Sequence, residues 1–218
     1  MSERKNSINT IFKNKFFDLK YISEFDKEVV NNLDINEYYE INPNSYEIKS
    51  ALWDKDNKYR ELTSSEISCQ LKHLKALELS AQSDKEISLI IEDDVLPLKG
   101  SFVKKINKIV MRKNDWDILF IGQGIGKKFI LKKINKKFKV ISKQFDVSHP
   151  ATNCAESYLI KNHAAQKLIN NYYPFNLPYD WELAYKIKKL GLRTKWLYPP
   201  IFHQGSITGE FNSQNRIN

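Results

Sequence analysis

Apolar positions are weakly patterned over the first sixty residues of the chain. Short apolar stretches there predict two strands, at 8–12 and 16–22, and a third at 38–41. Ser23 is placed to cap a helix that continues to about Leu33. Residues 42–59 are mostly polar and predict a loop.

The pattern becomes clear after residue 62. Thr63 or Ser64 is a suitable N-cap, and Glu66 is placed to complete a capping box. Apolar residues then recur at helical spacing, which predicts an amphipathic helix over 64–82. The apolar run 87–91 that follows a polar turn is typical of a strand buried on both faces.

The rest of the chain alternates strands with helices. We expect strands at 116–122, 156–160 and 192–198, and helices at 101–111, 164–172 and 181–190. This alternation predicts an α/β fold, with a mostly parallel sheet flanked by helices. Neither a repeat nor a Gly/Ser-rich linker divides the sequence, and its 218 residues fit one domain, 1–218.

Composition excludes some classes of protein. With 41% hydrophobic and 12% aromatic residues, the chain has enough apolar material for a core and is not disordered. It has no apolar run long enough for a membrane helix and no apolar signal core near its start. We therefore expect a cytoplasmic protein, bacterial or from a virus-infected cell, in which Cys69 and Cys154 are free thiols.

The net charge of +9 has a local origin. Residues 127–143 contain eight lysines and no acid, and without them the 27 basic and 26 acidic residues that remain give +1. This segment is predicted to be a basic flap or an edge hairpin. It could attract an anionic or lipid-linked acceptor or a membrane surface, or it could be a solvated edge.

Three carboxylates follow the first buried strand directly, at Glu92, Asp93 and Asp94. Ligands of open α/β sheets bind at the carboxyl ends of strands. Because side chains alternate along a strand, Glu92 and Asp94 point the same way, and such a pair with a substrate diphosphate suits Mn²⁺ or Mg²⁺. Acidic triplets are also common in solvated loops, but here the triplet follows buried apolar residues.

Other candidates lie further from this motif in sequence. Asp180 could cap the helix after it or accept a proton from a sugar hydroxyl, and Trp181 could stack on a sugar ring or belong to the core. His203 could be a late metal ligand or a structural histidine. Glu66 and His73 share one helix face, which could also be merely solvated.

Five segments in order resemble glycosyltransferase family 25, the family of lipopolysaccharide-biosynthesis and collagen galactosyltransferases. Residues 62–76 resemble its "GEIGC-x-x-SH-x-x-A" helix, and 89–95 its "LILEDDV" strand. The other three are 116–122 ("WDI-x-x-LG"), 155–165 ("AY-x-I-x-x-x-GA") and 178–181 ("P-x-D"), so the resemblance covers about 60–207. The chain differs at Ser65 and Lys72, and the family's opening element is not recognisable.

The resemblance implies a GT-A-type, Rossmann-like fold. It also implies transfer of galactose or glucose from a UDP-sugar to a glycan hydroxyl with inversion, in glycan or lipopolysaccharide biosynthesis. The site residues that it implies are a base (Asp180, with Glu156 as the second candidate), metal ligands (Asp94, Glu92 and His203), donor-side residues (Asp93, Glu66 and His73) and acceptor-side aromatics (Trp181 and Tyr179).

Two other functions remain open at this point. The chain could be an inactive family member that binds sugar, as the unrecognisable opening element would allow. It could instead bind nucleic acid through 127–143, where lysines alternate with Phe and Ile. That second function does not explain a buried strand that ends in three carboxylates, so we expect no nucleic-acid partner.

Overall fold

The computed structural model describes residues 2–13, 16–52, 56, 58–98, 101–112, 114–124, 143–146 and 154–211. The helices are α1 Ser2–Phe12, α2 Lys27–Val30, the 3₁₀ helix η1 Ile35–Glu37, α3 Pro43–Ser50, α4 Ser64–Ala81, α5 Phe102–Val110, α7 Asn162–Ile169, α8 Tyr179–Leu190 and α9 Gly205–Thr208. The strands are β1 Ile87–Ile91, β2 Val95–Pro97, β3 Ile118–Phe120, β4 Lys143–Asp146, β5 Ser157–Lys161, β6 Thr194–Tyr198 and β7 Phe202–Gln204.

The fold is mixed α/β, but its main sheet is mostly antiparallel. The strand order is β1-β5-β3-β6-β4, and β3 with β6 is the parallel pair among the described strands. The prediction of a mostly parallel sheet was therefore wrong. It failed because an apolar run shows that a strand is buried and does not show its direction. β1, β3 and β6 do run the same way, and β5 lies between β1 and β3 in the opposite direction.

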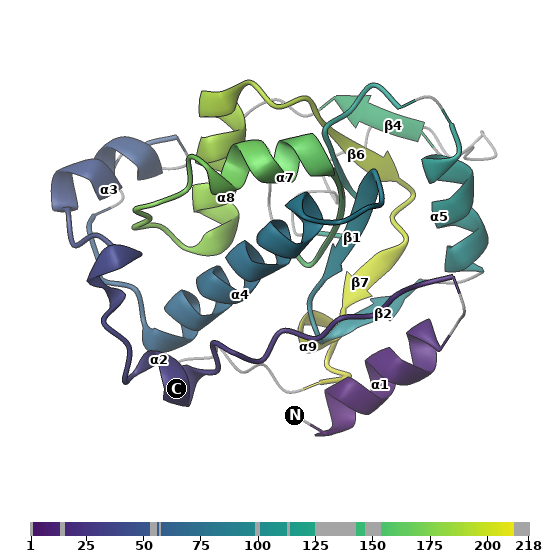
Figure 1. The fold of residues 1–218 in the computed structure, drawn as a ribbon, viewed down its shortest axis with the longest axis horizontal. Coiled ribbons are helices and arrows are strands. Elements are labelled where there is room, and N and C mark those ends of the chain that lie inside the picture. Colours follow the sequence, from purple (N-terminus) through teal and green to yellow (C-terminus); the bar gives the residue numbers. More distant parts are fainter. Residues whose placement is uncertain are drawn as a thin grey trace.

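Both faces of the sheet are covered, as the apolar strands predicted. Alternate residues of β3 point to opposite sides: Ile118 and Phe120 pack in one core, and Leu119 lies in the other. The first core is closed by α4, α7 and α8, and the second by α1 and α5 (Figure 1). The sheet is thus the middle layer of the fold, and its strand ends are the places left for a site.

The long helix α4 begins as predicted. The Thr63 side chain accepts a hydrogen bond from the Glu66 backbone N–H, and the Glu66 side chain accepts one from the Thr63 backbone N–H. This capping box fixes where α4 starts and therefore which residues of the helix face the sheet. At the other end of the chain, Gly191 ends α8 with a left-handed conformation (φ 62°), which glycine adopts without strain.

The first sixty residues differ most from the predictions. The expected strand at 8–12 is the end of helix α1, the expected strand at 16–22 has no regular structure, and 38–41 contributes an isolated bridge from Tyr39 to Phe175. The predicted loop contains α3, and the helix expected after Ser23 is the short α2. Helix α2 packs on α4, α3 on α8 and α1 on β2, so tertiary packing decides the structure of these segments.

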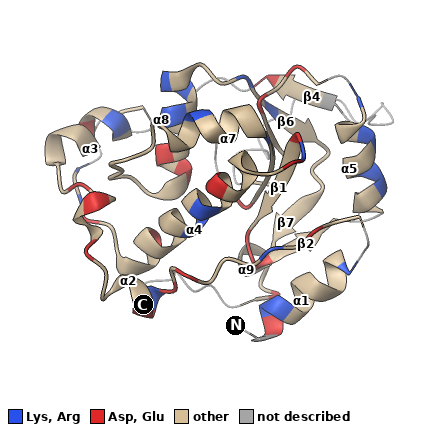
Figure 2. Cartoon of the chain, viewed as in Figure 1, with Lys and Arg blue, Asp and Glu red and all other residues tan. Residues whose placement is uncertain are grey.

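Charges of both signs are interspersed over the described residues (Figure 2). The lysine-rich segment that carries most of the net charge lies outside the described residues, apart from Lys143 at the start of β4. Whether this segment is a flap or a hairpin therefore stays a prediction. No helix in the described part of the chain is both long and apolar enough to cross a membrane.

Candidate functional site

Residues from distant parts of the sequence meet at one edge of the main sheet. The carboxyl ends of β1 and β3 lie beside the start of β5, because Ile91 pairs with Ser157 and Phe120 with Tyr158. The backbone N–H of Glu92 donates to the carbonyl oxygen of Glu156 at 2.9 Å. The acidic motif therefore begins directly beside the residue that precedes β5.

A second, two-stranded sheet holds the C-terminal segment against this motif. β2 follows the three carboxylates and pairs with β7, with Val95 opposite Gln204. The Gln204 Nε2 donates to the Glu92 Oε2 at 2.9 Å, and the Gly205 N–H donates to the Asp94 carbonyl at 2.8 Å. These contacts fix the backbone and one carboxylate of the motif.

Asp94 is the most buried of the three carboxylates, with 3% of its surface exposed. Its Oδ1 is buried and has no hydrogen-bond partner among the described residues. Burial raises the pKa of Asp94; a hydrogen bond from Ser206 opposes this, and the neighbouring Glu92 charge adds to it. A buried carboxylate oxygen without a partner is a good ligand for a cation.

Asp93 and His203 lie on either side of this buried group. The Asp93 carboxylate is about half exposed and forms an ion pair with Arg4 at 2.8 Å. The Nε2 of His203 lies 3.5 Å from the Glu210 Oε1, and its Nδ1 is buried without a partner in the described structure. His203 also lines a shallow groove of about 620 Å³ between α1, β2 and the residues after α9.

A cluster from two helices lies at the end of β1. The His73 ring of α4 stacks on Tyr179 with the ring centroids 3.8 Å apart, and its Nε2 is 3.6 Å from the Glu92 Oε1. The Asp180 carboxylate accepts a hydrogen bond from the Trp181 N–H. Burial raises the pKa of Asp180 to about 6, and the nearby Glu92 charge contributes while His73 opposes it.

The predicted acceptor aromatics differ in their surroundings. Tyr179 is 5% exposed, and its hydroxyl forms a 2.7 Å hydrogen bond with the Tyr158 hydroxyl in the core. It therefore presents its ring to His73 and little surface to solvent. Trp181 is half-buried at the first turn of α8. Glu66 caps α4 and forms an ion pair with Arg60 at 2.6 Å, so that side chain has a structural role.

Glu156 is almost completely buried, and its Oε1 accepts a hydrogen bond from the Gly124 N–H at 2.9 Å. Gly122 lies so close to it that an added Cβ would be 2.1 Å from the Glu156 Oε1. The segment after β3 therefore requires glycine where it crosses this carboxylate. The close packing fixes Glu156 at the same edge of the sheet as Glu92.

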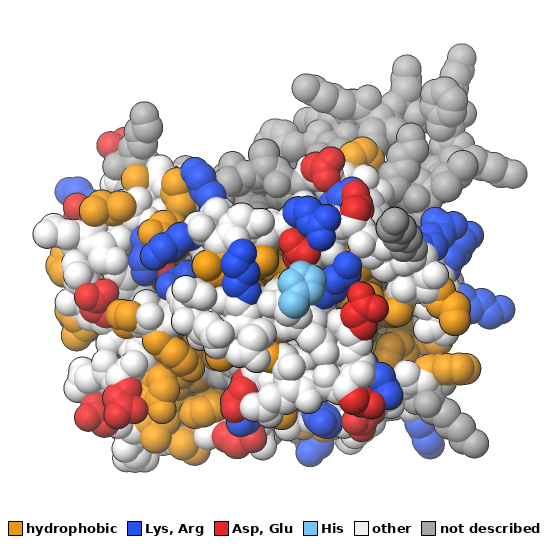
Figure 3. Space-filling model, turned by 45° about the horizontal axis from the view of Figure 1, so that its top comes forward, with side chains coloured by type: hydrophobic (Ala, Val, Ile, Leu, Met, Phe, Trp, Pro, Cys, Tyr) orange, Lys and Arg blue, Asp and Glu red, His pale blue; other side chains and the backbone are white. Residues whose placement is uncertain are grey.

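Other titratable groups form surface clusters away from this edge. Asp117 precedes β3, at the opposite edge of the sheet, and bridges His163 at 3.0 Å and Arg193 at 3.1 Å. Figure 3 shows a face on which acidic and basic side chains alternate around an exposed histidine. These pairs connect strands and helices at the surface.

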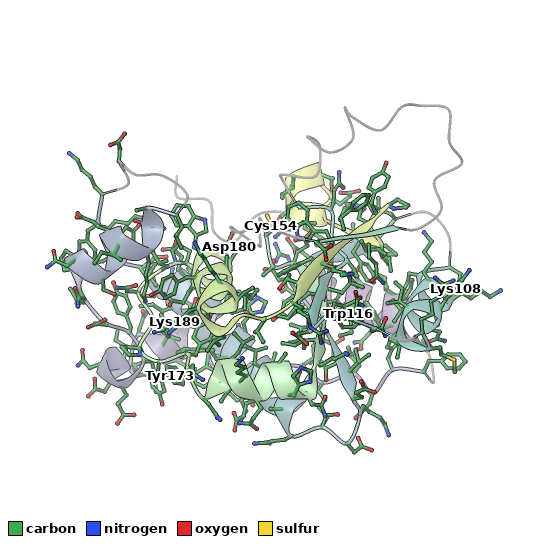
Figure 4. All side chains as sticks on the ribbon, turned by 90° about the horizontal axis from the view of Figure 1, so that it is seen from above. Lys108, Trp116, Cys154, Tyr173, Asp180 and Lys189 are labelled. Carbon is green, nitrogen blue, oxygen red and sulfur yellow. The ribbon has the colours of Figure 1, made fainter. Side chains whose placement is uncertain are left out.

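In Figure 4 Asp180, at the start of α8, and Cys154 both lie toward the middle of the molecule.

Comparison with known protein families identifies the chain. The model of glycosyltransferase family 25 (LPS biosynthesis protein) matches residues 1–183. This chain belongs to glycosyltransferase family 25. The match begins at residue 1, although the motifs we recognised begin near residue 60, and it ends before β6, β7 and His203. A comparison with curated proteins found no match.

The glycosyltransferase brings some of the predicted site residues together and separates others. Glu92, His73 and Asp180 form one cluster, with Glu156 beside it through the backbone. Asp94 and His203 do not join Glu92 in any group of three metal-ligating side chains within the described residues. The group that does form contains Cys69, which sequence reasoning missed; its spacing of four from His73 was the available signal.

Proposed function

We propose that this family 25 glycosyltransferase is a metal-dependent hexosyltransferase. In the proposed reaction, galactose or glucose passes from a UDP-sugar to a glycan hydroxyl, and the configuration at the anomeric carbon is inverted. The family match supports sugar transfer, and a sugar donor and a glycan acceptor follow from it. We further propose that the three strands of common direction and their acidic edge are the core of a GT-A-type domain.

The observation that carries the proposal is the position and pKa of Asp180. A general base works best when its pKa lies near the working pH, so that it is ionised and still takes up a proton readily. Burial and Glu92 raise the pKa of Asp180 to about 6, well above the ordinary value of 3.8. The alternative role of Asp180 as the cap of this helix is wrong, because α8 begins at Tyr179 and its N-cap is Pro178. Asp180 is therefore the proposed base for the acceptor hydroxyl.

The residues at the acidic motif fit a divalent cation such as Mn²⁺ or Mg²⁺. The orphaned Asp94 Oδ1 is the best ligand, with Glu92 beside it and His203 on the adjoining strand. When bound there, the ion would neutralise the charge that develops on the UDP leaving group. Asp93 is left to contact the donor, since its carboxylate is about half exposed.

Two other residues have proposed supporting parts. Glu156 would orient the segment after β3 through the Gly124 N–H and is the second candidate for the base, after Asp180. Trp181 is half-buried next to the proposed base and would stack on the acceptor sugar, since an aromatic face is an apolar platform for a ring.

The direct test is release of UDP from a panel of UDP-sugars with Mn²⁺, with and without glycan acceptors. We expect metal-dependent donor turnover that Asp94→Ala abolishes. Asp180→Asn should reduce transfer at least about 10²-fold, the usual contribution of a positioned base. Asp115→Asn is a matched control, because Asp115 precedes β3 at the opposite edge of the sheet and is exposed. Full transfer by Asp180→Asn would eliminate Asp180 as the base.

The pH dependence provides a second readout. Transfer by the unaltered enzyme should fall about tenfold per pH unit below the pKa of Asp180, near 6, because the base is then protonated. A transfer rate that stays flat down to about pH 4 would contradict this role. A complete lack of UDP release across the panel would instead favour an inactive, sugar-binding member of the family.

The lysines of 127–143 are proposed to attract an anionic acceptor. Replacing four of them with glutamine should raise the apparent KM for such an acceptor and leave donor hydrolysis unchanged. An unaltered KM would show that the segment is only a solvated, basic surface. Steep salt-dependent binding to DNA or RNA would favour the nucleic-acid function instead.

A further inference from the structure

We propose that Cys69, His73 and Glu92 form a second metal site, which shares Glu92 with the cation site proposed at Asp94, and that Zn²⁺ is its preferred ion. The ligand atoms of these three residues all lie within 4.8 Å of one another. Within the described residues, no other group of three such side chains is as close. The proposal does not depend on the hexosyltransferase activity.

The elements of the fold bring these side chains together. Cys69 and His73 are four residues apart on α4 and so project from the same face of the helix. Glu92 comes directly after β1, and its Oε2 is held by Gln204, which leaves Oε1 turned toward His73. The three ligands are therefore positioned by a capped helix and a strand end, which are rigid supports.

The separation of the ligands fits a tetrahedral ion. The Nε2 of His73 and the Oε1 of Glu92 are 3.6 Å apart, which is too long for a hydrogen bond. Two ligands about 2.1 Å from a tetrahedral zinc would be about 3.4 Å apart. The observed separation is thus close to that of two ligands sharing one ion.

His73 is largely removed from water. This residue is 7% exposed, and its Nδ1 is buried without a hydrogen bond to any described residue. A metal ion shared with Glu92 would be bound by the other ring nitrogen, Nε2, and would compensate that nitrogen for its loss of water. The stacking of the His73 ring on Tyr179 fixes the plane of the imidazole without a metal ion.

The chemistry of the donors selects the metal. A thiolate, an imidazole and a carboxylate are the ligands that zinc takes in proteins, whereas Mn²⁺ and Mg²⁺ prefer oxygen. Three protein ligands leave a fourth position open, as in zinc sites that bind water or a substrate oxygen. Asp180 is close enough for its charge to act on Cys69, so this position would lie near the proposed base.

Cobalt(II) is the probe, because a cobalt–thiolate bond gives a charge-transfer band in the near ultraviolet. The full chain would be stripped with a chelator and titrated with Co²⁺, followed by displacement with Zn²⁺. We expect the band in the unaltered protein and its complete loss in Cys69→Ser. Cys154→Ser is the matched control, since Cys154 is the other cysteine of the chain and lies outside the cluster; it should keep the band.

Two further variants keep the test independent of folding and of activity. Glu92→Gln should retain the thiolate band but weaken Zn²⁺ binding by at least about tenfold, because one ligand is lost. Asp94→Ala should keep both the band and the zinc affinity even when it abolishes donor turnover. Circular dichroism before metal addition shows that each variant is folded.

The outcomes separate this site from the proposed function. Absence of the band in the unaltered protein, or its survival in Cys69→Ser, would overturn the zinc site whatever the activity. Loss of the band in Cys154→Ser would also overturn it, since the thiolate would then come from elsewhere. The band with no UDP release would support the zinc site while the hexosyltransferase proposal failed.

Discussion

Neutralising Asp180 should make the protein more stable at neutral pH while removing its activity. The pKa of this carboxyl is about 6 in the folded protein, mainly because of burial, against an ordinary value of 3.8. At about 1.4 kcal/mol per pKa unit, ionising Asp180 in the folded state costs about 3 kcal/mol more than in the unfolded chain. Asparagine keeps the oxygen that accepts from the Trp181 N–H and has no charge to bury.

The sign follows from proton binding. Between about pH 4 and pH 6 the folded protein holds this proton and the unfolded chain has lost it, so stability falls as the pH rises. The stability that the protonated Asp180 carboxyl contributes to the folded state is fully present below about pH 4 and is lost as the pH rises through about 6. Asp180→Asn should therefore be more stable than the unaltered protein by up to about 3 kcal/mol at pH 8, with no difference near pH 4.

Urea unfolding at several pH values, followed by circular dichroism, measures this difference. The exposed Asp115 is the control, because its carboxylate gains from Lys195 and Asp115→Asn should give no increase in stability at any pH. If Asp180→Asn were less stable at pH 8, Asp180 would be a first-turn residue of α8 whose negative charge stabilises the helix. The raised pKa, and with it the argument for a base, would then be wrong.

Two further substitutions test the packing around the site. Gly122→Ala should destabilise the protein by about 2–4 kcal/mol, because the added Cβ would displace the buried Glu156 from the Gly124 N–H. In a Glu156→Ala background the same change should cost much less, and additive unfolding free energies would refute the contact. Lys49→Met should destabilise the protein by about 3–5 kcal/mol, since the buried Glu182 would lose an ion-pair partner 3.0 Å away. Thermal unfolding measures this loss, and an unchanged Tm would contradict the ion pair.

The sequence was most informative where the signal was local. The capping box at Thr63 and the apolar run of β1 were both predicted and confirmed, because each depends on residues a few positions apart. Helix α3 was missed although Asn42 and Pro43 form an N-cap followed by proline at the first turn. That signal was present but was outweighed by the polar composition of 42–59.

Features that depend on contacts between residues far apart in the sequence could not be predicted from local sequence patterns. The direction of β5 is set by its neighbours β1 and β3 and leaves no trace in the apolar pattern. Strands β2 and β7 have three residues each, too few to show alternation. Cys69 was expected to be a free thiol without a site role, because only the fold shows that Glu92 lies near it.

The insertion of β5 between β1 and β3 also has a consequence for synthesis of the chain. The ribosome releases β1 and β3 well before residues 157–161, so these two strands are exposed for a time without β5, the strand that pairs with both of them. During that interval their unpaired edges are apolar and open to other chains. A chain that stops before residue 157 should therefore aggregate, and nascent chains of this enzyme should depend on chaperones until β5 emerges.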